Sequence, residues 1–186
     1  MRIIGGRLKG KSINYIKNSI TRPLKDSVKE NIFNILQHSN LVKINIDNSN
    51  ILDLYSGIGS FGIECISRGA KKVTFFEQDT NAINILKKNL LKLSIADKTN
   101  IYNYHINANF IEGIKEKFDI FFLDPPFADT NFLQNLRILK KNKMFKKKHI
   151  VIVHREKKSK DNFNESLKVV EIKYYGRSKI IFGVFS

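Results

Sequence analysis

The strongest constraint on the fold is a regular alternation of apolar runs and amphipathic segments between residues 50 and 154. The apolar runs have the length of buried strands, and the segments between them space their apolar residues as helices do. We assign strands to residues 50–56, 71–77, 100–106, 118–124 and 148–154, and helices to a segment ending near residue 68 and to 80–93, 109–115 and 131–139. Because parallel strands need crossover connections, this pattern predicts a mainly parallel sheet with helices on both faces.

The C-terminal end of the chain departs from this alternation. Residues 166–175 and 178–186 are predicted to be two long strands joined through Gly176 and Arg177. A closing hairpin makes the last strand antiparallel to its neighbours. The predicted fold class is therefore α/β, a Rossmann-like sheet of seven strands that is mostly parallel.

The N-terminal end also differs from the rest. Residues 1–25 are basic and rich in Gly, and we expect two short strands there with Arg2, Arg7, Lys9 and Lys11 on the surface. A helix then begins at Asp26 or Ser27, and its apolar face consists of Val28, Ile32, Ile35 and Leu36. We divide the chain into a basic extension, 1–25, and a main domain, 26–186.

Composition limits the class of protein. The chain is long enough for one domain with its own core, and no run approaches the roughly 18 apolar residues of a membrane helix. The N-terminus lacks the apolar stretch of a secretory signal, and the single cysteine, Cys65, cannot form an internal disulfide. We expect a cytoplasmic monomer with no membrane association.

Net charge points to the partner. Lys and Arg number 33 against 17 Asp and Glu, a formal charge of +16, which attracts polyanions such as nucleic acid. The many Lys, Asn and Ile residues also fit a coding sequence rich in A and T, which adds lysine without selection for binding. Such a bias does not remove acidic residues, so we favour a nucleic-acid partner.

A glycine-rich turn follows the first predicted strand. Gly57, Gly59 and Gly62 fit the spacing G-x-G-x-x-G between a strand and a helix, where a ligand approaches the backbone and free N–H groups. Glu77 ends the next strand, where a carboxylate can accept both hydroxyls of a ribose. This arrangement suits NAD and S-adenosylmethionine (SAM) equally.

Asp53 distinguishes between these two cofactors. A carboxylate just before the glycines repels a pyrophosphate but attracts the sulfonium and ammonium groups of SAM. Asn107, at the end of the third strand, can accept a hydrogen bond from an adenine amino group. We therefore predict a SAM site, and we list its residues as Asp53, Ser56, Gly57, Gly59, Glu77 and Asn107.

A rigid turn ends the fourth predicted strand at Asp124, Pro125, Pro126 and Phe127. Two prolines fix φ near −65° and remove two N–H donors, so the turn offers acceptors to a planar amino group. Phe127 supplies a face for a base drawn out of its stack. We predict that these four residues hold an exocyclic amine in line with the methyl group, and that orientation supplies most of the rate enhancement. No general base is assigned.

These motifs resemble those of a known family. "LDLYSGIGSFGIE" and "FLDPPF" look like the cofactor and catalytic motifs of class I SAM-dependent amino-methyltransferases. The whole-chain pattern, with "MRIIGGRLKGK", "TRPLKDSVKENIFNIL" and "YGRSKIIF", is similar to the bacterial enzymes that methylate N2 of a guanine in 16S ribosomal RNA. The resemblance covers nearly all of the chain.

The resemblance implies a substrate and further contacts. It implies that the substrate is ribosomal RNA or a small-subunit assembly particle, that the basic N-terminus contacts RNA, and that Arg22, Pro23 and Asp26 form a loop near the active site. Ser27 and Lys29 stand where the family usually has arginines, so the resemblance implies no base or phosphate contact at these two positions.

Three other functions remain open from the residues. They are an adenine-N6 methyltransferase on DNA or RNA, an NAD-dependent oxidoreductase, which Asp53 argues against, and a non-catalytic RNA-binding module with a decayed cofactor site. The four histidines and Cys65 show no metal-ligand spacing, so we expect no metal. We expect His154, at the end of the fifth strand, to lie on the surface, and residues 140–148 to extend a solvated helix end.

Overall fold

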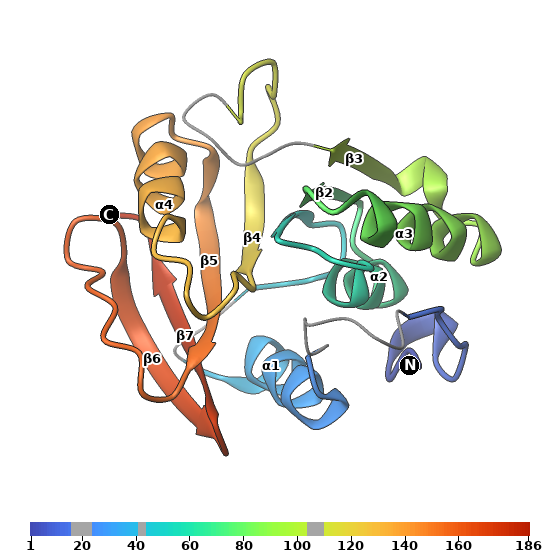
Figure 1. Cartoon of the computed structure of the whole chain (residues 1–186), viewed down its shortest axis with the longest axis horizontal. Coiled ribbons are helices and arrows are strands. Elements are labelled where there is room, and N and C mark those ends of the chain that lie inside the picture. The colour runs from blue at the N-terminus through green and yellow to red at the C-terminus, as the bar shows by residue number, and fades with distance from the viewer. Residues whose placement is uncertain (16–23, 41–43, 104–109) are drawn as a thin grey trace.

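The computed structural model describes residues 1–15, 24–40, 44–103 and 110–186 (Figure 1). Its strands form one sheet in the order β3-β2-β1-β4-β5-β7-β6. The strands are β1 (Asn50–Leu54), β2 (Lys72–Glu77), β3 (Thr99–Asn103), β4 (Phe118–Leu123), β5 (Phe145–Glu156), β6 (Lys168–Tyr175) and β7 (Ser178–Val184). Strands β3, β2, β1, β4 and β5 pair in parallel, and β7 is antiparallel to both β5 and β6. The predicted fold class is confirmed.

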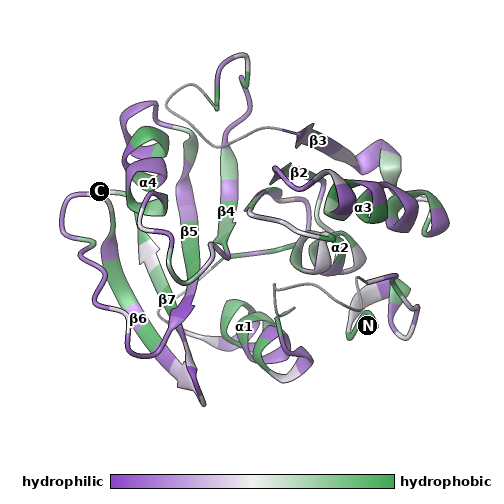
Figure 2. Ribbon diagram, viewed as in Figure 1, coloured by the Kyte–Doolittle hydropathy of each residue, from purple (hydrophilic) through white to green (hydrophobic). Residues whose placement is uncertain are grey.

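In the described ranges four α-helices cover the two faces of the sheet: α1 (Asp26–His38), α2 (Ser60–Ser67), α3 (Thr80–Lys92) and α4 (Phe132–Lys141). Buried residues of α1, α2 and α3 belong to one apolar cluster, and those of α4 belong to the cluster on the opposite face. In Figure 2 apolar and polar positions alternate around α3 and α4, as expected for helices with one face on a sheet. Within the described ranges, no helix is long and apolar enough to cross a membrane.

The predictions for residues 109–115 and 140–148 are wrong. The described part of the predicted helix 109–115 forms turns, because Gly113 adopts φ 81° and interrupts any helical path. The basic run 140–148 extends α4 only to Lys141, and β5 already begins at Phe145.

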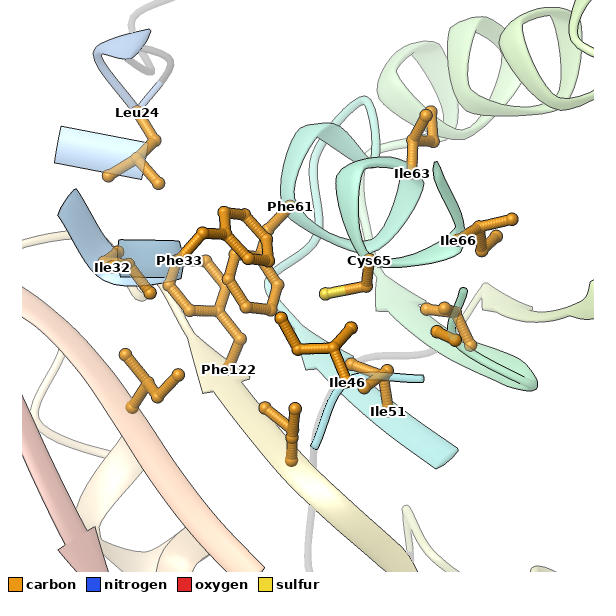
Figure 3. Packing of buried hydrophobic residues seen from close by; sticks show 14 of the residues in the cluster. Leu24, Ile32, Phe33, Ile46, Ile51, Phe61, Ile63, Cys65, Ile66 and Phe122 are labelled. Carbon is orange, nitrogen blue, oxygen red and sulfur yellow. The ribbon is translucent and has the colours of Figure 1, made fainter. Parts of the chain in front are cut away.

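A stack of three aromatic rings joins two helices to the sheet (Figure 3). Phe61 of α2 lies between Phe33 of α1 and Phe122 of β4, at centroid distances of 5.2 and 4.0 Å. Stacked pairs add about 0.5–1.5 kcal/mol to the burial of their surface. Since Phe122 comes two residues before Asp124, this stack fixes the end of β4 against α2.

The N-terminal segment does not form the two predicted strands. It makes a single antiparallel bridge between Arg2 and Ser12 around a short 3₁₀ helix, η1 (Gly6–Leu8). The division at residue 25 stays a prediction, but Ile3, Leu8 and Ile13 are buried in the same cluster as α1 and α2.

Side chains of α2 bind the backbone of this segment between the two residues of the bridge. The carboxylate of Glu64 accepts the N–H groups of Ile4 and Gly5, at 3.0 and 2.7 Å. Ser67 Oγ accepts the N–H of Leu8 and donates to the carbonyl of Gly5. These bonds satisfy backbone groups that a hairpin ladder would otherwise pair.

Glu64 is also the centre of a buried charge cluster. Its side chain is fully buried, 3.1 Å from Arg68 Nε and 3.6 Å from the Nζ of Lys29, which is 1% exposed. Lys29 Nζ also lies 3.4 Å from the carbonyl of Arg2. Lys29 is therefore a structural cation between α1, α2 and the N-terminal segment, and it is not free to bind a phosphate.

We expect Glu64→Gln to destabilise the protein by about 3 kcal/mol or more, because it removes the buried counter-charge of Lys29 and leaves only the partly exposed carboxylate of Asp26, 3.8 Å away. The free energy of unfolding in urea measures the change. Glu30→Gln, at an exposed position of α1, is the control and should change stability by no more than about 0.5 kcal/mol. Equal effects of the two substitutions would contradict a structural role for this cluster.

Candidate active site

The predicted site residues meet at the carboxyl ends of three adjacent strands. In the β1–β4 pair Asp53 lies opposite Phe122 and Leu54 opposite Leu123, so Asp124 follows at the same level. The backbone N–H of Asp124 donates to the carbonyl of Leu54 at 3.4 Å. Glu77 ends β2 on the other side of β1. The pairing thus brings the three predicted carboxylates to one edge of the sheet.

Asp53 is a buried carboxylate that is only half satisfied. Its side chain is 1% exposed, and Oδ2 accepts the N–H of Gly62, in the first turn of α2, at 3.0 Å. Oδ1 is buried and has no hydrogen-bond partner among the described residues. Burial raises the pKa of the Asp53 carboxyl well above its ordinary value, and the charges of Asp124 and Glu77 add to this effect. Such a group stabilises a bound cation.

The glycines of the turn after β1 have different roles. Gly57 has φ 54°, and a side chain there would point into open space, as a ligand-facing position requires. Gly62 instead allows close packing, because a Cβ there would lie 2.3 Å from the ring of Phe75 on β2. Gly59 has φ 81° and would clash with Leu86. Of the three glycines, only Gly57 leaves room for a ligand.

Glu77 and Ser56 tie this turn to β2. Glu77 Oε2 accepts the N–H of Gly57 at 2.6 Å, and Oε1 accepts those of Gln78 and Asp79 at 2.8 and 2.9 Å. A carboxylate accepts about four hydrogen bonds, so about one acceptor position is free for a ribose hydroxyl. Ser56 donates from both its N–H and its hydroxyl to the carbonyl of Phe76.

The turn after β4 presents Asp124 and Phe127. The side chain of Asp124 is 25% exposed, and its Oδ1 lies 2.8 Å from His154 Nδ1. Pro125 is buried, whereas Phe127 is 45% exposed and offers an open ring face. The rings of Phe127 and His154 make an edge-to-face contact with 5.7 Å between their centroids, and this contact fixes one side of Phe127.

Arg155 holds the same turn from behind, and sequence reasoning missed it. Its guanidinium donates to the carbonyls of Pro126 and Phe127, each at 3.0 Å, and to the carboxylate of Asp161 at 3.1–3.3 Å. It also stacks on the ring of Phe132 of α4, 4.5 Å from the centroid. Burial raises the pKa of Asp161, but hydrogen bonds from Arg155 and Ser159 outweigh burial and lower it below the ordinary value.

The expected surface position of His154 is wrong. The β4–β5 register places Leu123 opposite Val153, so His154 lies beside Asp124, and it is 7% exposed. Its Nε2 is buried and has no partner among the described residues. Among all described residues, only two buried side-chain atoms lack a hydrogen-bond partner, Asp53 Oδ1 and His154 Nε2. Both lie at this edge of the sheet. The signal in the sequence was the position of His154 at the end of a strand next to β4.

The predicted RNA contacts lie elsewhere. Arg2, Arg7, Lys9 and Lys11 are all exposed on the N-terminal segment, which Figure 1 shows beside α2 and α3. Asp26 begins α1, and its carboxylate is 3.8 Å from Lys29 Nζ.

Arg22 and Asn107 lie outside the described residues, as does Pro23. Among the residues that are described, no group of His, Cys, Asp and Glu is arranged to hold a metal ion.

Relatives with this sequence pattern carry methyltransferase names. A protein of Buchnera aphidicola named ribosomal RNA small subunit methyltransferase D is 36% identical over 159 residues, which cover 84% of this chain and 76% of the relative. A Haemophilus influenzae protein with the same name is 35% identical over 159 residues, with coverage of 84% and 79%.

Solved structures share the fold. A putative methylase from Haemophilus influenzae superposes with a TM-score of 0.75 at 31% identity, and a putative methyltransferase from Escherichia coli with a TM-score of 0.81 at 24% identity. Each comparison covers 98% of this chain and 96% of the other. Residues 1–184 match the model of the family described as conserved hypothetical protein 95. The chain therefore belongs to that family and has a Rossmann-like methyltransferase fold.

Proposed function

We propose that this protein is a SAM-dependent methyltransferase that modifies the exocyclic N2 amine of a guanine in small-subunit (16S) ribosomal RNA. The observation that carries the proposal is the buried, unpartnered Oδ1 of Asp53, one strand away from the turn that holds Asp124 and Phe127. The relatives named as small-subunit ribosomal RNA methyltransferases, at 35–36% identity, support the substrate class.

The residues around Asp53 fit SAM. When bound, SAM supplies an electrophilic methyl group on a positively charged sulfur. The carboxylate of Asp53 attracts the cationic end of such a ligand. The positive charge of the ligand in turn offsets the cost of burying the negatively charged carboxylate. Gly57 leaves the space that the ligand needs. Glu77 accepts a ribose hydroxyl with its remaining acceptor position, and Ser56 and Gly59 keep the turn in shape. Asn107 stays a proposed adenine contact.

The turn after β4 fits a planar base with an amino group. Asp124 accepts from the exocyclic N–H, while Pro125 and Pro126 keep the backbone stiff. Stacking of the base on exposed Phe127 is worth about 1–3 kcal/mol. The rate enhancement then comes chiefly from holding the amine and the methyl group in line.

The charge of +16 and the exposed Arg2, Arg7, Lys9 and Lys11 support an RNA substrate, because they place positive charge on a surface beside α2. Arg22 and Asp26 complete the proposed RNA contacts. We propose that the protein acts as a monomer in the cytoplasm.

Methyl transfer to small-subunit particles that lack the modification tests the function. With radiolabelled SAM, we expect label on the N2 amine of one guanine, located by mapping the labelled nucleotide.

Asp124→Ala should lower the rate about 100-fold or more while the dissociation constant for SAM, measured by calorimetry, changes little. Activity that survives this substitution would contradict the role of the turn, and a protein that binds no SAM would favour a non-catalytic RNA-binding module.

We expect Asp53→Asn to weaken SAM binding about 30-fold or more, since it removes a buried charge that pairs with a cation, worth roughly 2–5 kcal/mol. It should also flatten the pH dependence of stability. Because the pKa of Asp53 is raised, the folded protein keeps a proton that the unfolded chain has lost, so stability without SAM falls as pH rises above about 4. Calorimetry measures SAM binding, and urea unfolding at pH 5 and pH 8 measures the pH dependence of stability. If Asp53→Asn left that pH dependence unchanged, the raised pKa of Asp53 would be contradicted.

We expect Arg155→Lys to lower the transfer rate about tenfold or more with little change in SAM affinity, because lysine cannot hold both carbonyls of the turn and Asp161. Arg155 is buried, so Asp161→Asn, which keeps an acceptor but removes the charge, is a milder second variant. Arg137 of α4 forms an exposed ion pair with Glu165, so Arg137→Lys is the matched control and should retain the wild-type rate. A normal rate in both Arg155→Lys and Asp161→Asn would exclude a role for this contact.

A further inference from the structure

His154 and Asp124 form a hydrogen-bonded pair whose direction is set by chemistry. His154 Nδ1 lies 2.8 Å from Asp124 Oδ1, and a carboxylate oxygen accepts. In the neutral form of the imidazole, this hydrogen bond places the proton on Nδ1 and leaves a lone pair on Nε2. The hydrogen bond fixes both the rotation of the ring and the position of one carboxylate oxygen.

The second ring nitrogen is then a buried acceptor with nothing to accept. Nε2 has no partner among the described residues, and the imidazole is 7% exposed. Leaving a buried acceptor unpaired costs about 1–3 kcal/mol, so native proteins seldom do so without a reason. The imidazole ring itself contacts the two groups that we assign to the target base, Asp124 through Nδ1 and the ring of Phe127.

The side chains concerned project from the same face of the sheet. Asp53 pairs with Phe122 across β1 and β4, and Asp124 lies two residues further along β4, so both carboxylates point to the face covered by α1 and α2. His154 lies two residues beyond Ile152, which is buried on that face. The imidazole is therefore on the side where cofactor and base would meet.

We propose that His154 is a specificity-determining residue: Nδ1–H holds Asp124 for the amine, and Nε2 accepts the N1–H of the target guanine. This inference rests on the proposed function. Guanine presents two neighbouring donors, N2–H and N1–H, to this pair of acceptors. Adenine presents an amino group beside a bare N1 lone pair, which would face the lone pair of Nε2. The pair Asp124–His154 thus favours a guanine amine over an adenine amine.

Two substitutions separate the two roles of the imidazole. In His154→Asn the side-chain amide can donate to Asp124 from the place of Nδ1 but leaves no acceptor at the place of Nε2. In His154→Gln the longer side chain can place its amide oxygen where Nε2 was but loses the donor to Asp124. His149→Asn, at a half-buried position earlier in β5, measures the general cost of changing a histidine on this strand.

The substrate pair is a reconstituted small-subunit particle with either guanine or 2-aminopurine at the mapped target nucleotide. 2-Aminopurine keeps the C2 amine but has a lone pair at N1. We expect wild-type protein and His149→Asn to prefer guanine in kcat/KM by about tenfold or more, the factor that corresponds to one unpaired buried acceptor. His154→Asn should reduce this preference at least severalfold, and His154→Gln should keep most of it while its kcat falls. The loss of O6 in 2-aminopurine affects all variants alike and cancels in the comparison.

The outcomes distinguish this inference from the proposed function. Wild-type protein that labels no guanine amine would overturn both. Wild-type protein that labels guanine, together with a His154→Asn variant that keeps the full preference over 2-aminopurine, would overturn the role of His154 alone. A purely structural histidine would lower stability and rate on both bases equally and leave the preference unchanged.

Discussion

The parallel pairing of β1 with β4 is the constraint on which the site depends. Its register puts Leu54 opposite Leu123, so both strands end at the same level and their next polar residues share one edge. A shift of one residue would turn Asp124 to the opposite face and separate it from Asp53. Specific packing holds this register, because Phe122 of β4 stacks on Phe61 of α2 and a shift of β4 would break that contact.

Helix α2 connects this edge to the rest of the molecule. Its first turn donates from Gly62 to Asp53, its Phe61 stacks between α1 and β4, and Glu64 and Ser67 hold the N-terminal segment. A rigid helix of this kind transmits position, so the segment with the proposed RNA contacts has a defined place relative to the site. The motif "SFGIE" therefore combines a contact to the site with the attachment of the N-terminus.

The turn after β4 is stiff for more reasons than its prolines. Prolines fix φ within the turn, but they do not fix where the turn lies relative to the sheet. Two successive residues of β5 do so from opposite faces: His154 contacts the Asp124 carboxylate, and Arg155 binds the carbonyls of Pro126 and Phe127. Because successive side chains of a strand alternate in direction, one short strand end supports the turn on both sides.

The sequence alone determined the α/β alternation, the closing hairpin and the strand ends that carry Asp53, Glu77 and Asp124, because strand and helix periodicities and turn residues are local properties. It did not determine the close packing of Gly62 against Phe75, the attachment of residues 1–15 to α2, or the burial of Lys29, His154 and Arg155. Those features depend on which strands become neighbours and how closely a helix approaches them. A charged or titratable side chain has the same local signature on a surface as in a buried cluster, so only the tertiary structure decided that a lysine is structural and that a histidine lies beside the proposed catalytic carboxylate.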